Sequence, residues 1–327
     1  MGSTGLWFVA IALIATITTA DSAEAQQGRI AYLFGAARSS GMKMDLMVVD
    51  IDNGNTVSLT NDREIAYTRG GTDNSYALAW SPDGRRIAFK VHDQIDVIGV
   101  EDGARQTLNT GAGGLPGDPA WSPDGTRIAF TRLDRDRDIF VVDVAGGEPV
   151  QLTDSPDRDA APAWSPDGRK IAFWSGRDGN AEIYVMNADG SDQTRLTDSP
   201  EADMNPAWSP DGSRIAYGSG PSISTRRGTN IWVMAADGGN AVNLTGNPNT
   251  DTYNAAPTWS PDGTWIAYLY ILGTRGQIRA IHVDSGDRIE VTPNTGTLSL
   301  FPSWSPATPF ETLIEAVSWG RLKGDLR

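Results

Sequence analysis

The sequence contains no cysteine and only two histidines among its 327 residues. The absence of cysteine excludes disulfide bonds, thiolate metal ligands, a cysteine nucleophile and a lipid anchor on cysteine. Basic residues are also scarce, because 27 lysines and arginines face 41 aspartates and glutamates and leave a formal net charge of −14. Without an excess of basic residues the chain lacks the electrostatic footprint for binding a phosphate backbone. Nucleic acid is therefore not an expected partner.

Catalytic motifs are missing as well. No serine stands on the sharp elbow that hydrolases use for their nucleophile, and the two histidines, His92 and His282, lie far apart in the sequence. We expect both imidazoles to be structural. The glycine-rich segment 111–117 lacks the lysine and the hydroxyl residue of a phosphate-binding loop. No catalytic residue is predicted, and the sequence favours a protein that is not an enzyme.

Long apolar runs are absent beyond the first 25 residues. Leu6–Ala15 is apolar but too short to span a bilayer, and Ala23-Glu24-Ala25 has the small-residue pattern of a cleavage site. We predict a signal peptide over 1–25 and an exported protein, periplasmic or secreted. An uncleaved anchor is the alternative, since only the amino terminus carries positive charge ahead of the apolar run. No membrane span is predicted in the mature chain.

A phrase close to Trp-Ser-Pro-Asp-Gly, followed by an apolar strand, recurs along the chain. Its tryptophans are 41 to 51 residues apart, a period that suits four-stranded propeller blades. They are Trp80, Trp121, Trp164, Trp208, Trp259 and Trp304. Proline fixes φ and glycine takes a positive φ, so the phrase predicts a tight turn between two strands. A proline two residues before five of these tryptophans indicates an edge strand, beside a central channel.

Counting the strands predicts an all-β, six-bladed propeller over residues 28–306. Three strands that lack a first strand precede the first tryptophan, at 28–34, 45–50 and 56–60. The last tryptophan, in contrast, has a first strand and none after it. Pairing of the N-terminal and C-terminal strands would complete the sixth blade and leave no open sheet edge around the ring.

The segment PAWSPDGRKIAFWSGRDGNAEIYVMNADGSDQTRLTDSP, Pro162–Pro200, resembles the repeat of TolB-type six-bladed β-propellers. Similar repeats occur in the propeller of prolyl oligopeptidases, whereas the Gly-His and Trp-Asp pairs of WD-type propellers are absent. The resemblance implies a protein-binding role in the cell envelope. TolB carries an α/β domain ahead of its propeller and oligopeptidases carry a hydrolase domain behind it. Neither matches this sequence, which is expected to be the propeller alone.

Polar residues stand five positions before most of the repeat tryptophans. They are Ser75, Asp159, Asp203, Asn254 and Ser299, with Pro116 as the exception. If the blades superpose, these positions form a ring at one mouth of the channel, where carboxylates would attract a calcium ion or a basic protein segment. The alternative is that they are ordinary polar loop residues. We take this mouth as the candidate binding site and calcium as the candidate ion.

Two further segments are candidates for recognition. The segment 220–230 lengthens a hairpin, and its Arg226 and Arg227 are suited either to an acidic partner or to a solvated loop tip. The tail 307–327 is predicted to contain a short helix that packs under the propeller, because its apolar residues have helical spacing. These residues are Phe310, Leu313, Ile314 and Val317.

The segment Asp134–Asp138 has carboxylates at alternate positions, as a calcium loop does. It lacks the glycine and the bidentate glutamate that such a loop requires. We expect Arg135 and Arg137 to neutralise these acids on a solvated hairpin tip.

Together these patterns favour a monomeric scaffold that binds a protein partner of the cell envelope, with a peptide segment in the channel. Two alternatives remain open. One is a lactonase or lyase that depends on a divalent ion held in the channel. The other is an accessory subunit of a separately encoded peptidase or hydrolase.

Overall fold

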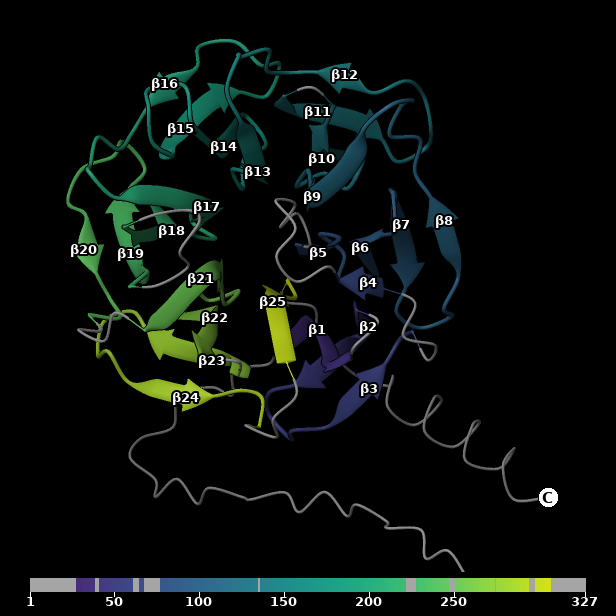
Figure 1. The fold of residues 1–327 in the computed structure, drawn as a ribbon. Coiled ribbons are helices and arrows are strands. Elements are labelled where there is room, and N and C mark those ends of the chain that lie inside the picture. The colour runs from purple at the N-terminus through teal and green to yellow at the C-terminus, as the bar shows by residue number, and fades with distance from the viewer. Residues whose placement is uncertain are drawn as a thin grey trace, which may run out of the picture.

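The strands of the computed structural model form six blades around a common centre (Figure 1). The structure describes residues 28–38, 41–60, 65–67, 77–134, 136–221, 228–246, 251–273, 275–293 and 298–306. Within these ranges the regular secondary structure is β-strand, and the predicted all-β, six-bladed propeller is confirmed.

Blades 1 to 5 each use four consecutive antiparallel strands, with the first strand innermost and the last at the periphery (Figure 1). Blade 1 consists of β5 (Leu78–Trp80), β6 (Arg86–Val91), β7 (Gln94–Gly99) and β8 (Arg105–Thr107), and blade 2 of β9 (Leu115–Trp121), β10 (Arg127–Leu133), β11 (Arg137–Asp143) and β12 (Val150–Gln151). Blade 3 consists of β13 (Asp159–Trp164), β14 (Lys170–Ser175), β15 (Glu182–Asn187) and β16 (Thr194–Arg195), and blade 4 of β17 (Ala202–Trp208), β18 (Arg214–Gly220), β19 (Asn230–Ala235) and β20 (Val242–Asn243). Blade 5 consists of β21 (Thr252–Trp259), β22 (Trp265–Leu272), β23 (Arg275–His282) and β24 (Arg288–Glu290).

Blade 6 combines strands from both ends of the described chain. From the centre outward its strands are β25 (Leu298–Trp304), β1 (Arg29–Arg38), β2 (Gly41–Asp50) and β3 (Thr56–Ser58). β25 runs antiparallel to β1, with Trp304 opposite Ile30. The short β4 (Ile65–Tyr67) is an additional partner of β2. A strand from the end of the chain thus supplies the inner strand that the N-terminal strands lack.

The Ser-Pro-Asp-Gly corners connect the first and second strands of blades 1 to 5. In blade 2, Ser122 Oγ donates to Asp124 Oδ1 at 2.6 Å and accepts from Arg127 N at 2.9 Å. The glycines of these corners have φ between 65° and 72°, which a residue with a Cβ resists. In blade 6 the equivalent hydrogen bonds join two segments that are far apart in the sequence. Arg29 N donates to Ser305 Oγ at 3.1 Å, and Ser305 N donates to Arg29 O at 2.8 Å.

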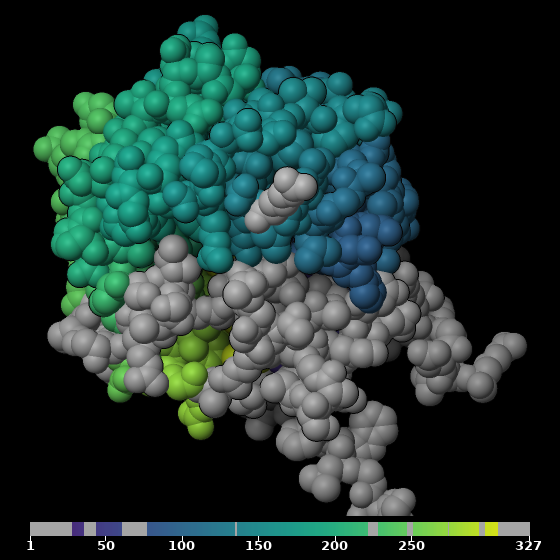
Figure 2. Space-filling view, turned by 45° about the horizontal axis from the view of Figure 1, so that its top comes forward, coloured from purple at the N-terminus to yellow at the C-terminus, as the bar shows by residue number. Residues whose placement is uncertain are grey.

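The hydrophobic core lies between the blades. Buried clusters in the described residues occupy all six contacts between neighbouring blades. They form because the second and third strands are apolar on both faces; in β10 the segment Ile128–Phe130 is fully buried. The surface of blades 2 to 4, teal to green in Figure 2, accordingly continues from one blade to the next.

Arginines from one blade also cover tryptophans of the following blade. In each case the arginine is the first residue of a second strand, and its guanidinium carbon lies 4.7–5.1 Å from the ring centroid. The pairs are Arg29–Trp80, Arg86–Trp121, Arg127–Trp164 and Arg214–Trp259. A guanidinium over an indole face is attracted by the ring quadrupole. The repeated arginine therefore links consecutive blades.

The predicted signal peptide, 1–25, and the predicted helix in 307–327 lie outside the described residues. In the part of the chain that the structure describes, no helix has the length and apolar character needed to cross a membrane.

Candidate binding channel

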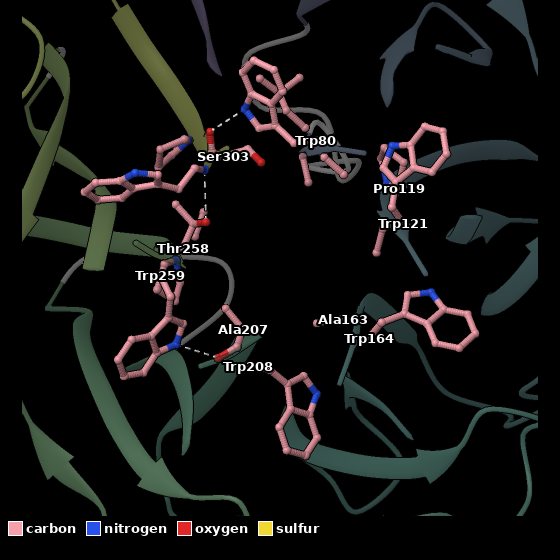
Figure 3. Close-up of a pocket in the computed structure, with 18 of the residues that line it drawn as sticks. Trp80, Pro119, Trp121, Ala163, Trp164, Ala207, Trp208, Thr258, Trp259 and Ser303 are labelled. Carbon is pink, nitrogen blue, oxygen red and sulfur yellow. Dashed lines mark hydrogen bonds between the residues drawn. The ribbon is translucent and has the colours of Figure 1, made fainter. Parts of the chain in front are cut away.

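The first strands of all six blades surround a central cavity of ≈ 490 Å³. Figure 3 shows the labelled tryptophans arranged around this opening. The wall consists mainly of the residues from three before each repeat tryptophan to the tryptophan itself, such as 161–164 in blade 3. The predicted proline-bearing edge strand beside a central channel is confirmed, and Pro162 is one of these lining residues.

A β-bulge shapes the wall in most blades. In blade 3 the register between β13 and β14 shifts between Ala160 and Ala163. The residue before the proline takes a positive φ of 49° to 56° in five blades. These residues are Asp118, Ala161, Asn205, Ala256 and Phe301. A left-handed conformation costs a non-glycine residue about 1–2 kcal/mol. Such strain, repeated around one cavity, identifies the channel as the candidate functional site.

Two of the repeat tryptophans link neighbouring first strands by hydrogen bonds. Trp80 Nε1 donates to Ser303 O and Trp259 Nε1 donates to Ala207 O, each at 3.0 Å (dashed in Figure 3). Five of the six repeat tryptophans are only 6–7% exposed, whereas Trp208 is partly exposed. Five of these tryptophans are therefore packed into the wall of the channel, and Trp208 differs from them in its greater solvent exposure.

The structure places the predicted ring residues in equivalent positions but buries them. Asp159, Asp203, Asn254 and Ser299 lie on the first strands of blades 3 to 6 and are 0–2% exposed, while Ser75 lies outside the described residues. These four buried side chains therefore do not form the open ring of carboxylates that the sequence predicted. The bulge is the physical reason, because one extra residue transfers a side chain to the opposite face of its strand.

Asp159 belongs to a polar cluster between blades 2 and 3. It accepts a hydrogen bond from Arg177 Nη2 at 2.9 Å. The hydroxyl of Thr153, which donates to Asp138 Oδ1 at 3.4 Å, also interacts with Asp159. Burial raises the pKa of Asp159, and burial together with the nearby Asp159 charge raises the pKa of Asp138 to about 6.

Asp203 has the same arrangement between blades 3 and 4. Thr197 Oγ1 donates to the fully buried Glu182 at 2.5 Å and also interacts with Asp203. Arg195 Nη2 donates to Glu182 Oε1 at 2.9 Å. Burial raises the pKa of Asp203 to about 6, and the Glu182 charge adds to this shift. The arrangement concentrates two acidic side chains in a site that water does not reach freely.

The histidines occupy structural positions. His92 has a φ of 53° in the turn between β6 and β7. His282 Nδ1 accepts from Ser285 N at 3.2 Å, and its ring meets the Trp265 ring edge-on at 5.1 Å. Within the described ranges, no three His, Cys, Asp or Glu side chains come together as a metal-binding group. Calcium at the predicted ring stays a prediction.

The other candidate segments gave different outcomes. Arg226 and Arg227, together with Arg135, lie outside the described residues. Arg137 was expected on a solvated tip, but it is 5% exposed. That expectation is wrong, because Arg137 pairs with Leu133 and already belongs to the sheet. The sequence signal of a buried position was the apolar run Ile139–Val142, which begins two residues after Arg137 and continues the same strand.

The blade order, the buried contacts between blades and the central cavity define the chain as a six-bladed β-propeller. A family model described as the TolB beta propeller domain matches residues 17–308. The chain belongs to this TolB β-propeller family.

No curated protein sequence matches the chain at a significant level. Among solved structures, TolB from Acinetobacter baumannii superposes with a TM-score of 0.72 at 24% identity, over 86% of this chain and 67% of that one. A putative TolB from Agrobacterium tumefaciens gives 0.65 at 20% identity, over 84% and 90%. An oligogalacturonate lyase in complex with manganese gives 0.52 at 16% identity, over 79% and 72%. At these identities the similarity shows the shared fold.

Proposed function

We propose that this chain is an exported protein-binding scaffold of the periplasm or cell envelope, which receives a peptide segment of its partner in the central channel. The observation that carries the proposal is the ≈ 490 Å³ cavity, whose wall contains tryptophans from all six blades and prolines beside them. Aromatic side chains are enriched where proteins bind one another. The formal net charge of −14 favours a basic segment. Membership of the TolB family supports the same role.

Blocking the channel tests this proposal. Ala120 and Ala163 are partly exposed on its wall, so the double variant Ala120→Arg/Ala163→Arg would fill the cavity. Val150→Arg is the matched control, since Val150 is 59% exposed on the outermost strand β12. Cross-linked affinity capture from cell envelopes should recover a partner with the parent and the control but not with the blocked variant. Equal capture by all three proteins, at equal thermal stability, would contradict the proposal.

Calcium bound by Asp159 and Asp203, the two carboxylates among the predicted ring residues, is a separate proposal. The buried acid pairs around Asp159 and Asp203 support it, because a cation would offset their charge. Metal analysis of the purified protein, with Asp159→Asn/Asp203→Asn as the comparison, tests it. Bound calcium that is lost in the variant would support the site, and calcium-free parent protein would contradict it. A divalent-ion enzyme is the rival function, and it requires an ion-dependent turnover that the scaffold does not.

A further inference from the structure

The contact between blades 3 and 4 departs from the arginine–tryptophan pattern. Lys170 is the first residue of β14 and thus stands where Arg86 and Arg127 stand in blades 1 and 2. Lys170 is exposed, whereas those arginines are partly buried over the next tryptophan. Among the described residues no cation lies over Trp208, the tryptophan that follows Lys170 in the ring. Lys170 does not cover Trp208, and Trp208 is correspondingly more exposed than the other repeat tryptophans.

The difference between lysine and arginine explains this departure. A guanidinium is planar and weakly hydrated and therefore stacks on an indole, whereas an ammonium is compact and strongly hydrated. Lys170 consequently extends into solvent. Trp208 packs against the cluster between blades 3 and 4, lines the channel and stays partly exposed. The contact between blades 5 and 6 is not open in this way, because Trp265 replaces the arginine and packs in the same cluster as Trp304, which is 6% exposed.

We propose that the open face of Trp208 is a docking site for an arginine side chain of the protein partner. The proposal rests on the scaffold function and names the chemistry that one part of the channel recognises. Four equivalent tryptophans in this chain are covered by a guanidinium, so the geometry of the position suits that group.

The electrostatics of the neighbouring corners support the same occupant. Asp167 and Asp211 belong to the Ser-Pro-Asp-Gly corners next to Lys170 and Trp208, and both are exposed. The Ser165 and Ser209 hydroxyls donate to these carboxyls and lower their pKa values, so both corners carry negative charge at neutral pH. A partner arginine would thus find an aromatic face with carboxylates nearby.

A titration with blocked tripeptides tests the proposal without a known partner. Glycyl-arginyl-glycine, its lysine analogue and its neutral citrulline analogue are added to the full chain, and the indole N–H resonance of Trp208 is followed by NMR. Trp208→Phe assigns that resonance. The arginine peptide should shift it most. Lys170→Arg supplies an internal guanidinium and should weaken the binding of the arginine peptide about two- to fivefold.

The reverse substitution provides the matched control. Arg127→Lys recreates the lysine of blade 3 at Trp164 and should make that indole respond to the arginine peptide. Equal shifts with arginine and citrulline peptides, or unchanged affinity in Lys170→Arg, would overturn the inference. Its failure is distinguishable from failure of the scaffold function. A partner lost from the blocked channel but still bound by Lys170→Arg would leave the scaffold standing and remove the arginine site.

Discussion

Each first strand of blades 1 to 5 leads into a Ser-Pro-Asp-Gly corner at one end. In blades 3 and 4 a buried aspartate, Asp159 or Asp203, lies in the first two residues at the other end of that strand. At the corners, the Ser122 and Ser209 hydroxyls lower the pKa values of Asp124 and Asp211 to about 2. At the opposite end, burial raises the pKa of Asp203 to about 6. The same side chain is thus charged where donors surround it in solvent and resists ionisation where a second acid lies beside it in the interior.

The largest effect is expected from removing the cation at the buried end. Arg177→Met leaves the fully buried Asp159 without its guanidinium donor. The free energy of unfolding should fall by about 3–4 kcal/mol at pH 8, since an unpaired buried charge is costly. The loss should be smaller at pH 5, because removal of Arg177, which lowers the pKa of Asp159, raises that pKa further and lets protonation offset part of the lost interaction as the pH falls. Urea unfolding measures both values.

Arg169→Met is the control for this comparison. Arg169 is exposed beside the corner aspartate Asp167 and should contribute less than about 1 kcal/mol. If both variants lost the same free energy, the distinction between the two ends would fail.

The second effect concerns pH. The folded pKa of Asp203, about 6, lies above its ordinary value of 3.8, so the folded state favours the protonated form. The stability that this group contributes is present below pH 4 and is lost as the pH rises to about 6. Asp203→Asn should recover about 2–3 kcal/mol at pH 8 and little at pH 4. Urea unfolding at pH 4, 6 and 8 checks this.

The corner aspartates should show the opposite sign. The folded pKa of Asp211 is depressed to about 2, so its contribution is present above pH 4 and is lost as the pH falls through 2. Asp211→Asn should therefore destabilise the protein at pH 7. A stabilising Asp211→Asn at neutral pH would show that the two ends do not differ in this way.

A third, smaller effect is expected at the corner itself. Ser209 is 1% exposed; its Oγ donates to Asp211 Oδ1 at 2.6 Å and accepts from Arg214 N at 2.9 Å. Ser209→Ala should cost about 1–2 kcal/mol and raise the pKa of Asp211 toward its ordinary value. NMR titration of the carboxyl measures the pKa. Ser191→Ala, in the exposed outer turn at Asp189, is the control and should change stability less.

The smallest effect concerns the stacking beside the corners. Arg127→Gln uncovers Trp164 and should cost about 0.5–1 kcal/mol while making that indole more accessible to acrylamide quenching. Lys170→Gln should change neither quantity, because Lys170 does not cover Trp208. Equal quenching of the parent and Arg127→Gln would contradict the role of the arginine.

The blades were predictable because their chemistry is local and repeated. Proline and glycine determine the corner wherever they occur, and strands that are apolar on both faces must lie between other sheets. The buried position of Asp159 was not predictable in this way, because it depends on a bulge near Ala161 that no residue type announces. The stacking of Arg127 on Trp164 was missed, although a basic residue recurring before Ile-Ala was a visible signal.

The sequence by itself determined the number of blades, the corners that join their inner strands and the negative charge of the chain, because each depends on residue type and spacing alone. The tertiary structure decided which aspartates are buried and which tryptophan is left uncovered. Asp203 and Asp211 are both aspartates and stand only eight positions apart in the sequence. Their pKa values differ because Asp203 lies buried between two blades whereas Asp211 lies in solvent. Burial and charge proximity depend on segments that only folding brings together.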